Sequence, residues 1–234
     1  MNIGTLQIGP DRPCAIVGEL GPNHAGSLER ALQLIRAAKE AGADAVKFQL
    51  YEPDELTWCG SGHRAEYMLT GGPWVGRDLA DLYREAQTPW DWAPELFAHA
   101  KEVGIPAFAS VFSPVGVGCA EALGCPAYKV ASAEVAWPAL IEAVAATGKP
   151  VVLSDGLVTA DQLWAAVERV GAERTVILLC ESAYPASSWD YNLRALVSAV
   201  RGKLPVGVSD HTTGVDLAVA AVALGASLIE KHLM

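Results

Sequence analysis

Residues 14–50 read CAIVGELGPNHAGSLERALQLIRAAKEAGADAVKFQL, and this stretch decides the fold. It begins with the apolar run 14–20 and ends with a second apolar run, 45–50. Between the runs, apolar residues recur at helical spacing, and Gly42 follows where a helix end favours a left-handed residue. The apolar face consists of Leu28, Ala31, Leu32, Ile35 and Ala38. The stretch therefore predicts a strand, a helix and a second strand.

The same unit recurs along the rest of the chain. Short apolar runs alternate with amphipathic stretches, and their near-continuous apolarity is typical of strands buried on both faces of a parallel sheet. The further predicted strands are 107–112, 128–132, 151–154, 176–180, 206–209 and 227–232. The glycines expected at helix ends are Gly42, Gly104, Gly124, Gly148, Gly171, Gly202 and Gly225. We therefore expect eight parallel strands with seven intervening helices.

This count favours an α/β fold of the closed (β/α)8 type, a TIM barrel, over an open doubly wound sheet. An open sheet more often has about five or six strands and a glycine-rich dinucleotide loop. The sequence contains neither a GxGxxG motif nor a Walker A motif. We expect one barrel domain over residues 1–234.

Two segments depart from the regular pattern. Residues 51–90 are rich in glycine, proline and tryptophan, and we interpret them as a long loop excursion after the second strand. The eighth predicted strand, 227–232, runs to the end of the sequence. We therefore expect the barrel to lack its eighth outer helix, so that either another chain covers this strand or the sequence has been cut.

Charge and composition exclude several classes of protein. Lys and Arg number 17 against 27 Asp and Glu, so the formal net charge is −10 and the average surface repels a nucleic-acid backbone. The amino end lacks the basic segment and the continuous apolar stretch of a signal peptide. The longest near-apolar run, 217–229, is well short of the roughly 20 residues of a membrane helix. We expect a soluble protein with neither a nucleic-acid nor a membrane partner.

The five cysteines form no CxxC pair and are odd in number, which indicates reduced thiols and a cytoplasmic location. Cys180 lies near a predicted strand end, but the sequence offers it no evident partner for nucleophilic catalysis. We therefore expect the cysteines to be structural.

Polar residues end nearly every apolar run. In such barrels the active site lies at the carboxyl ends of the strands, so these residues should meet at one rim. They are Glu19, Asn23, Lys47, Gln49, Lys129, Ser132, Ser154, Asp155, Glu181, Ser182, Tyr184, Ser209, Asp210, His211, Glu230 and His232.

Two lysines stand inside apolar strands, Lys47 in AVKFQL and Lys129 in AYKVAS. An unpaired buried ammonium is costly, so each needs a reason to be there. One possibility is a pair of structural ion pairs with Glu19 or Glu230. The alternative is that the lysines and the hydroxyl groups of nearby serines bind a phosphate or carboxylate, which needs several converging donors. Those serines are Ser132, Ser154 and Ser209.

His211 and His232 end the seventh and eighth strands, which are neighbours in a closed barrel. Two imidazoles with Glu230 or another oxygen donor suit a divalent ion such as manganese, iron or zinc. We interpret the other histidines, His24, His63 and His99, as hydrogen-bonding residues.

Glu19 follows the first strand and faces the same rim. Its carboxylate is a candidate general base, because burial in the mouth of the barrel would suit that role. A structural ion pair with Lys47 is the alternative, and spacing does not decide between the two.

Six stretches together resemble the sialic acid synthase family, the N-acetylneuraminate synthases and their legionaminate and pseudaminate relatives. They are GELGPNHAGSLERALQLIRAAKEAGADAVKFQ, AYKVASAE, GKPVVLSDG, CESAYP, VGVSDHTTG and IEKHLM. The resemblance spans 16–232 and falls, in order, at seven of the eight predicted strand ends.

The resemblance implies a TIM barrel that condenses phosphoenolpyruvate with an N-acylated aldose such as N-acetylmannosamine, forming a nine-carbon 2-keto acid and releasing phosphate. It also implies a divalent metal, commonly Mn²⁺. By position in the motifs, His211 and His232 would hold the metal, and Glu19 would assist a water. The phosphoenolpyruvate ligands would be Lys47, Lys129, Ser132, Ser154 and Ser209. The residues facing the sugar would be Gln49, Tyr184 and Glu230.

The chain departs from the family pattern at several points. The usual C-terminal antifreeze-like domain and the eighth helix are absent from the sequence, SVFSP replaces the more usual STPF, and Glu181 stands where Thr is common. These departures leave two other hypotheses open: a non-catalytic barrel that keeps the anion pocket as a binding or assembly module, and another barrel enzyme. The latter would be a synthase acting on a phosphorylated sugar or a metal-dependent hydrolase. We expect a homodimer or a complementing C-terminal partner, because the uncovered strand would expose apolar area.

Overall fold

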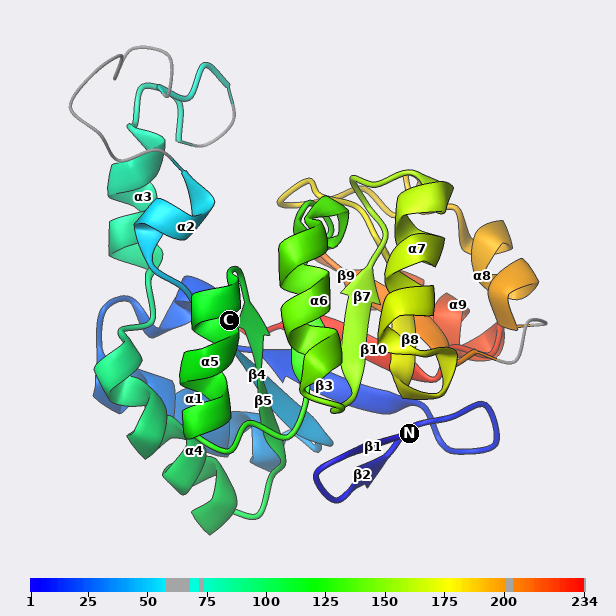
Figure 1. Cartoon of the computed structure of the whole chain (residues 1–234), viewed down its shortest axis with the longest axis horizontal. Helices are drawn as coiled ribbons and strands as arrows, with labels where there is room; N and C mark the ends of the chain where they lie inside the picture. Colours follow the sequence, from blue (N-terminus) through cyan, green and yellow to red (C-terminus); the bar gives the residue numbers. More distant parts are fainter. Residues whose placement is uncertain (58–67, 72–73, 201–203, 234) are drawn as a thin grey trace.

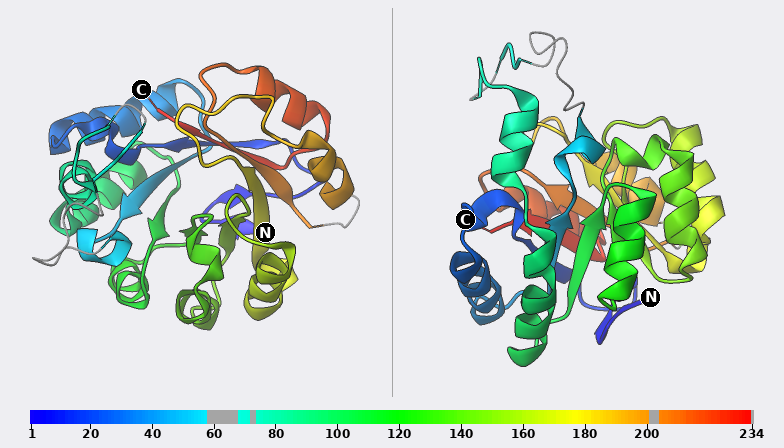
Figure 2. Two further views of the ribbon diagram at one scale, coloured as in Figure 1. Left: turned by 90° about the horizontal axis from the view of Figure 1, so that it is seen from above. Right: turned by 60° about the vertical axis from the view of Figure 1, so that its left-hand side comes forward.

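The computed structural model describes residues 1–57, 68–71, 74–200 and 204–233. Eight parallel strands close into a barrel in the order β10-β3-β4-β5-β6-β7-β8-β9. Each strand pairs with the next one along the chain, and β10 closes the barrel by pairing with β3. Helices surround the strands on the outside (Figures 1 and 2). The predicted (β/α)8 barrel is confirmed.

The strand positions agree closely with the prediction. The barrel strands are β3 (Ala15–Glu19), β4 (Ala45–Leu50), β5 (Ala107–Val111), β6 (Tyr128–Val130), β7 (Val151–Ser154), β8 (Thr175–Cys180), β9 (Val206–Asp210) and β10 (Leu228–His232). The largest difference is at β6, which ends at Val130 rather than at Ser132. There the carbonyl of Ala131 accepts a hydrogen bond from the Val135 N–H at 3.2 Å, and the chain turns into the short helix η4 (Glu134–Ala136). The bend places Ser132 in a loop rather than in the strand.

The outer helices follow strands β3 to β9. They are α1 (Leu28–Glu40), α4 (Ala93–Glu102), α5 (Pro114–Ala122), α6 (Pro138–Ala146), α7 (Ala160–Val170), α8 (Leu193–Val200) and α9 (Asp216–Ala223). Helix α1 begins at Ser27, whose hydroxyl accepts a hydrogen bond from the Arg30 N–H at 3.2 Å. Three residues of its predicted apolar face, Ala31, Ile35 and Ala38, are fully buried. Within the described residues no helix follows β10.

Six of the seven glycines predicted at helix ends have positive φ angles. Gly202, the seventh, lies outside the described residues. At Gly42 the φ of 90° is one that other residues rarely adopt, so glycine sets the end of α1.

The segment 51–90 is not the plain loop that we predicted. Its described part contains α2 (Pro53–Leu56), α3 (Leu79–Ala86) and the short helix η3 (Trp90–Trp92). The side chain of Asp78 caps α3 by accepting a hydrogen bond from the Asp81 N–H at 3.1 Å. The side chain of Glu55 folds back and accepts one from the Glu52 N–H at 3.0 Å, at the start of α2. These local caps support short helices despite the glycine- and proline-rich composition.

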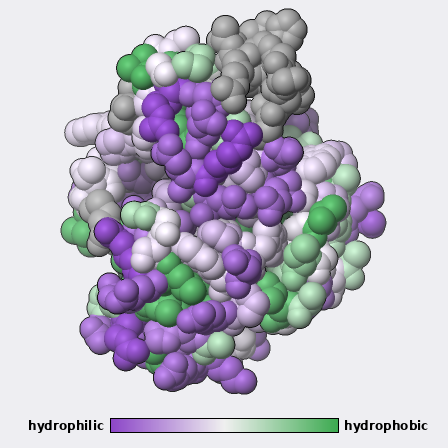
Figure 3. Space-filling view, turned by 90° about the vertical axis from the view of Figure 1, so that its left-hand side faces the viewer, coloured by the Kyte–Doolittle hydropathy of each residue, from purple (hydrophilic) through white to green (hydrophobic). Residues whose placement is uncertain are grey.

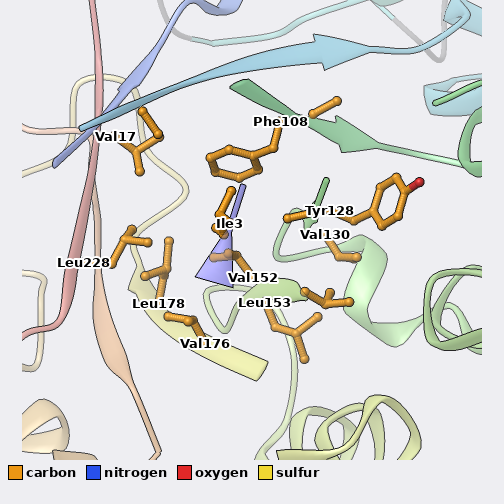
Figure 4. Packing of buried hydrophobic residues seen from close by; sticks show 14 of the residues in the cluster. Ile3, Val17, Phe108, Tyr128, Val130, Val152, Leu153, Val176, Leu178 and Leu228 are labelled. Atoms are coloured by element: carbon orange, nitrogen blue, oxygen red, sulfur yellow. The ribbon is translucent and has the colours of Figure 1, made fainter. Parts of the chain in front are cut away.

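A two-stranded hairpin at the amino end was not predicted. Strands β1 (Asn2–Ile3) and β2 (Leu6–Gln7) pair antiparallel. The side chain of Ile3 is fully buried and lies among Phe108, Val152 and Leu178 of the barrel strands (Figure 4). The hairpin therefore fills the amino-terminal end of the barrel with an apolar side chain.

The surface, the helices and the cysteines can be compared with the expectations of no membrane partner and of structural thiols. On the face that carries α1 and α4, hydrophilic side chains predominate and apolar ones form separate small patches (Figure 3). Of the helices in the described part of the chain, none combines the length and the apolarity that a membrane span requires. Cys14, Cys119, Cys125 and Cys180 are free thiols, and Cys59 lies outside the described residues. Burial raises the pKa of Cys180, which disfavours the thiolate that nucleophilic catalysis needs.

Gly207 of β9 tests how tightly the barrel strands are packed. A Cβ at this position would lie 1.9 Å from the carbonyl oxygen of Leu228 in the neighbouring strand. We predict that Gly207→Ala lowers the free energy of unfolding by at least about 1–3 kcal/mol, since the two strands must move apart. Urea unfolding followed by circular dichroism measures this.

The control is Gly118→Ala in α5, where a Cβ would meet nothing within 4 Å. Alanine is a better helix former than glycine by about 1 kcal/mol, so this variant should be as stable as the parent or more stable. Equal unfolding midpoints for the two variants would contradict the packing argument.

Candidate active site

The strand register brings the predicted site residues to one rim. Glu19 at the end of β3 lies opposite Lys47 of β4 on one side and His232 of β10 on the other. Glu230 of β10 lies opposite Ser209 of β9. Residues of four consecutive strands of the barrel, β9, β10, β3 and β4, therefore converge, as the sequence predicted.

Lys47 is the centre of a buried ion cluster. Its Nζ lies 2.8 Å from Glu19 Oε2 and 3.0 Å from Glu230 Oε1, and all three side chains are at most 5% exposed. Glu19 Oε1 also accepts a hydrogen bond from the Gly21 N–H at 2.7 Å. The ion pairs that the sequence left open as an alternative are therefore present at Lys47.

The charges of the cluster support one another. Burial acts to lower the pKa of Lys47, but the neighbouring carboxylates of Glu19 and Glu230 outweigh it and raise that pKa. Burial acts in the opposite sense on Glu230, and Lys129 and Lys47 hold its pKa below the usual range. Both groups are therefore charged at neutral pH.

Lys129 is much less well compensated. Its Nζ is 3.9 Å from Glu230 Oε1 and 3.4 Å from the carbonyl oxygen of its neighbour Val130. Burial lowers the pKa of Lys129, and Glu230 only partly offsets this. A buried ammonium in this state has unused capacity for an anionic partner.

Of the serines predicted to bind an anion, Ser154 has an unused donor within the described part of the chain. The hydroxyl of Ser154 is buried and has no hydrogen-bond partner among the described residues. Ser132 Oγ and Ser182 Oγ lie 3.1 Å apart, while Ser209 Oγ donates to Glu230 Oε1 at 3.0 Å. Buried polar groups are normally paired, so the open donor at Ser154 indicates a place for a ligand acceptor.

The two histidines predicted to hold a metal lie side by side. The ring centroids of His211 and His232 are 5.5 Å apart, with the planes tilted by 56°. Burial lowers the pKa of His211 to about 4 and also lowers that of His232, so both rings are neutral at pH 7. His211 Nδ1 lies 2.6 Å from the carbonyl oxygen of Glu181 and must donate to it, which leaves Nε2 with the lone pair.

These features fit a divalent ion bound by two imidazoles. A neutral ring whose other nitrogen donates to a carbonyl is the usual form of a histidine ligand, and the two rings are near enough to share an ion. In the described part of the chain, no group of three or more His, Cys, Asp and Glu side chains is arranged to hold a metal. The remaining positions would therefore fall to water or substrate oxygens.

The residues predicted to face the sugar differ in how far they are buried. Tyr184 is 51% exposed at the rim, where its ring stacks on His211 with centroids 4.0 Å apart and its hydroxyl lies 3.0 Å from His211 Nε2. Gln49 lies two residues beyond Lys47 on β4, on the same side of the strand. Glu230 lies between the two lysines, and its Oε2 lacks a hydrogen-bond partner among the described residues.

The histidines outside this pair have the hydrogen-bonding roles that we predicted, where the structure describes them. His24 Nε2 lies 3.1 Å from Thr88 Oγ1, and its Nδ1 accepts from the Gly26 N–H at 3.1 Å. His99 Nδ1 lies 3.3 Å from a carboxylate oxygen of Glu102. His63 lies outside the described residues.

Two polar residues near the rim were not assigned a role from the sequence. Ser182 adds a hydroxyl next to Ser132. Burial raises the pKa of Glu134, and the charge of Lys129 acts on it in the opposite sense, so this carboxyl group belongs to the same electrostatic surroundings. Glu134 lies two residues after Ser132 in AYKVASAE, so its position after a predicted strand end was the available signal.

Comparison with known proteins now decides the family. The NeuB family model matches residues 34–234. The chain belongs to the NeuB family. This NeuB chain is 40% identical over 238 residues to the pseudaminic acid synthase of Campylobacter jejuni, a match that covers 100% of the chain and 68% of that relative. It is 35% identical over 231 residues to the human N-acetylneuraminate-9-phosphate synthase, covering 97% of the chain and 63% of the human protein.

Solved structures agree with this assignment. The N-acetylneuraminic acid synthetase of Leptospira borgpetersenii, in complex with citrate, superposes on 100% of this NeuB chain and 78% of its own, with a TM-score of 0.87 and 30% identity. A truncated 3-deoxy-D-arabino-heptulosonate 7-phosphate synthase of Thermotoga maritima, at 15% identity and a TM-score of 0.70, shares the fold. Family membership places the chain among the sugar-acid synthases, and it spans about two thirds of the length of the curated relatives it matches.

The two lysines should differ sharply in what they contribute to stability. Lys47→Met leaves the buried carboxylates of Glu19 and Glu230 without their close cation, which should cost about 3–5 kcal/mol of unfolding free energy. Lys129→Met removes a poorly compensated charge and should cost less than half as much. Urea unfolding of the two variants measures the difference.

The double variant Lys47→Met/Glu19→Gln provides the control, because it removes one of the stranded charges. It should be more stable than Lys47→Met alone, and this comparison is informative even when the single variant is largely unfolded. A greater loss for Lys129→Met than for Lys47→Met would contradict the ion-cluster assignment.

Proposed function

We propose that this protein condenses phosphoenolpyruvate with an N-acylated aldose of the N-acetylmannosamine type, forming a nine-carbon 2-keto sugar acid and releasing phosphate. The observation that carries the proposal is a pair of donors at the rim: the under-compensated ammonium of Lys129 and the buried hydroxyl of Ser154, which has no hydrogen-bond partner among the described residues. They lie in a NeuB-family barrel, whose named relatives synthesise sugar acids. Donors that converge from different strands suit an anion with several oxygens.

In this proposal the phosphate and carboxylate of phosphoenolpyruvate lie against the ammonium of Lys129 and the serine hydroxyl groups. Lys47, held between Glu19 and Glu230, adds positive charge at the base of the site. Ser182 pairs with Ser132 and would add a further hydroxyl. Gln49 and Tyr184 face the sugar, together with the free Oε2 of Glu230.

His211 and His232 would hold a divalent ion together with substrate oxygens, and Mn²⁺ is our proposed metal. When bound, such an ion supplies Lewis acidity at the open-chain aldehyde of the sugar. The neutral state of both rings, the result of burial lowering the pKa of each, is the protonation state that this role needs.

The chain's own residues account for the other steps. Carbon 3 of phosphoenolpyruvate forms a bond to the aldehyde carbon, whose oxygen takes up a proton from solvent, and positive charge develops at carbon 2. Glu19 accepts a proton from a water that adds to carbon 2 and later returns it to solvent. The tetrahedral centre then expels phosphate by cleavage of its C–O bond, and its hydroxyl proton passes to the departing phosphate as the ketone forms. The Gly21 N–H and Lys47 hold the Glu19 carboxylate in place for this task.

The test is phosphate release by the purified protein. Release should require both phosphoenolpyruvate and the N-acylated aldose, and it should stop when Mn²⁺ is removed by a chelator. Release with neither sugar nor metal would contradict the proposal. Binding of phosphoenolpyruvate without any turnover over a panel of aldoses would instead favour a non-catalytic binding module.

We predict that Glu19→Gln lowers kcat by at least about 100-fold, because the proton acceptor is lost, while Mn²⁺ binding is unchanged, because His211 and His232 both remain. The matched control is Glu102→Gln, which makes the same carboxylate-to-amide change next to His99, on the outer helix α4. Steady-state phosphate release and isothermal titration with Mn²⁺ measure the two effects. Turnover unchanged by Glu19→Gln would remove this residue from the mechanism.

A further inference from the structure

Tyr191 lies in the loop between β8 and α8, outside the set of residues assigned to the reaction. Tyr191 is only 8% exposed, and the hydrogen bonds of its hydroxyl group go to the backbone. It donates a hydrogen bond to the carbonyl oxygen of Ser209 at 2.8 Å and accepts one from the backbone N–H of His211 at 3.1 Å. One hydroxyl group therefore bridges the backbone on the two sides of Asp210.

The two hydrogen bonds of Tyr191 lie where the strand pairing of β9 ends. The pairing of β9 with β8 ends at Ser209, and its pairing with β10 ends at Asp210. The N–H of His211 is therefore beyond the last strand pair, and the hydroxyl of Tyr191 provides its partner. The same hydroxyl group donates to the carbonyl of Ser209. It therefore holds the backbone in place for one residue beyond the last strand pair.

Tyr191 is itself firmly held. Its own carbonyl accepts a hydrogen bond from the Leu193 N–H at 3.0 Å, at the start of α8, and Leu196 of that helix is fully buried in the core. Burial raises the pKa of Tyr191 to about 12, so the hydroxyl keeps the proton that it donates to Ser209. The buried ring and its connection to α8 thus fix the position of the Tyr191 hydroxyl group at the end of β9.

The two residues that Tyr191 bridges both face the site. Ser209 Oγ donates to Glu230, and the ring of His211 lies against His232. The ring of His211 is fixed at Nδ1 by the Glu181 carbonyl, and its own backbone carbonyl accepts from the Ala186 N–H at 3.0 Å. Without the bond to Tyr191, the N–H of His211 would lose its partner and its backbone would be free to shift.

We infer that Tyr191 is a positioning residue, whose hydroxyl group sets the backbone of Ser209 and His211 so that the serine hydroxyl and the imidazole face the ligands correctly. This inference rests on the proposed function and names a residue that acts through two others. Groups that orient a metal ligand in this indirect way typically change metal affinity by about 10–100-fold when removed.

The test is Tyr191→Phe, which keeps the buried ring and removes only the hydroxyl group. We expect Mn²⁺ to bind at least about tenfold more weakly, measured by isothermal titration without phosphoenolpyruvate or sugar, because His211 is less well placed. We also expect the KM for phosphoenolpyruvate to rise more than kcat falls, since Ser209 is displaced as well. Near-ultraviolet circular dichroism checks that the variant is folded.

The matched control is Tyr128→Phe. Tyr128 is also buried, but its hydroxyl donates to Glu121 from the amino-terminal end of β6, away from the rim. Tyr191→Phe loses two hydrogen bonds of a buried tyrosine hydroxyl and Tyr128→Phe loses one, so a general loss of stability should affect both. Only Tyr191→Phe should weaken Mn²⁺ binding and raise the KM.

The outcomes separate this inference from the proposed function. Mn²⁺ affinity and KM values that are the same in Tyr191→Phe as in Tyr128→Phe would overturn the positioning role and leave the proposed function intact. A second comparison starts from His211→Asn, which removes the imidazole that Tyr191 is inferred to position. The positioning role requires that the double variant Tyr191→Phe/His211→Asn bind Mn²⁺ no more weakly than His211→Asn alone, and an additive loss would overturn it. Failure of the parent protein to bind Mn²⁺ would contradict the proposed metal site and this inference together.

Discussion

The buried ammonium of Lys47 holds together the part of the barrel on which the rest depends. It lies on β4 and contacts carboxylates of β3 and β10, the two strands whose pairing closes the barrel. Removing either carboxylate or the lysine would leave an uncompensated charge in a region that solvent does not reach. Closure of the fold and assembly of the candidate site are therefore the same event at this point, because both need these three strands in one register.

The barrel could be predicted from the sequence because the pattern of a strand followed by a helix is repeated along the chain. Eight apolar runs with intervening amphipathic stretches leave few alternative folds, and the carboxyl-end rule then places Glu19, Lys47, His211 and His232 at one rim. The same rule did not show which side chains each residue would contact. Glu230 was expected to face the sugar, and its Oε1 also lies near Lys47 and Lys129, because a strand position alone does not show which partners lie opposite.

Features that depend on short local interactions were harder to predict. The hairpin of β1 and β2 has strands of two residues each, too short for an alternating pattern to show. The helices α2 and α3 depend on caps within a segment whose composition suggested a loop. Tyr191 acts through the conformation of a loop, and a tyrosine in SSWDYN carries no signal of what its hydroxyl will reach.

The apolar side chain that the amino-terminal hairpin inserts into the barrel affects how substrates enter and products leave. Ile3 is fully buried among the packed side chains of the barrel strands (Figure 4). We therefore expect substrates and products to use the opposite end of the barrel, where Tyr184 lies half exposed. A single shared entrance of this kind would favour ordered binding and ordered release.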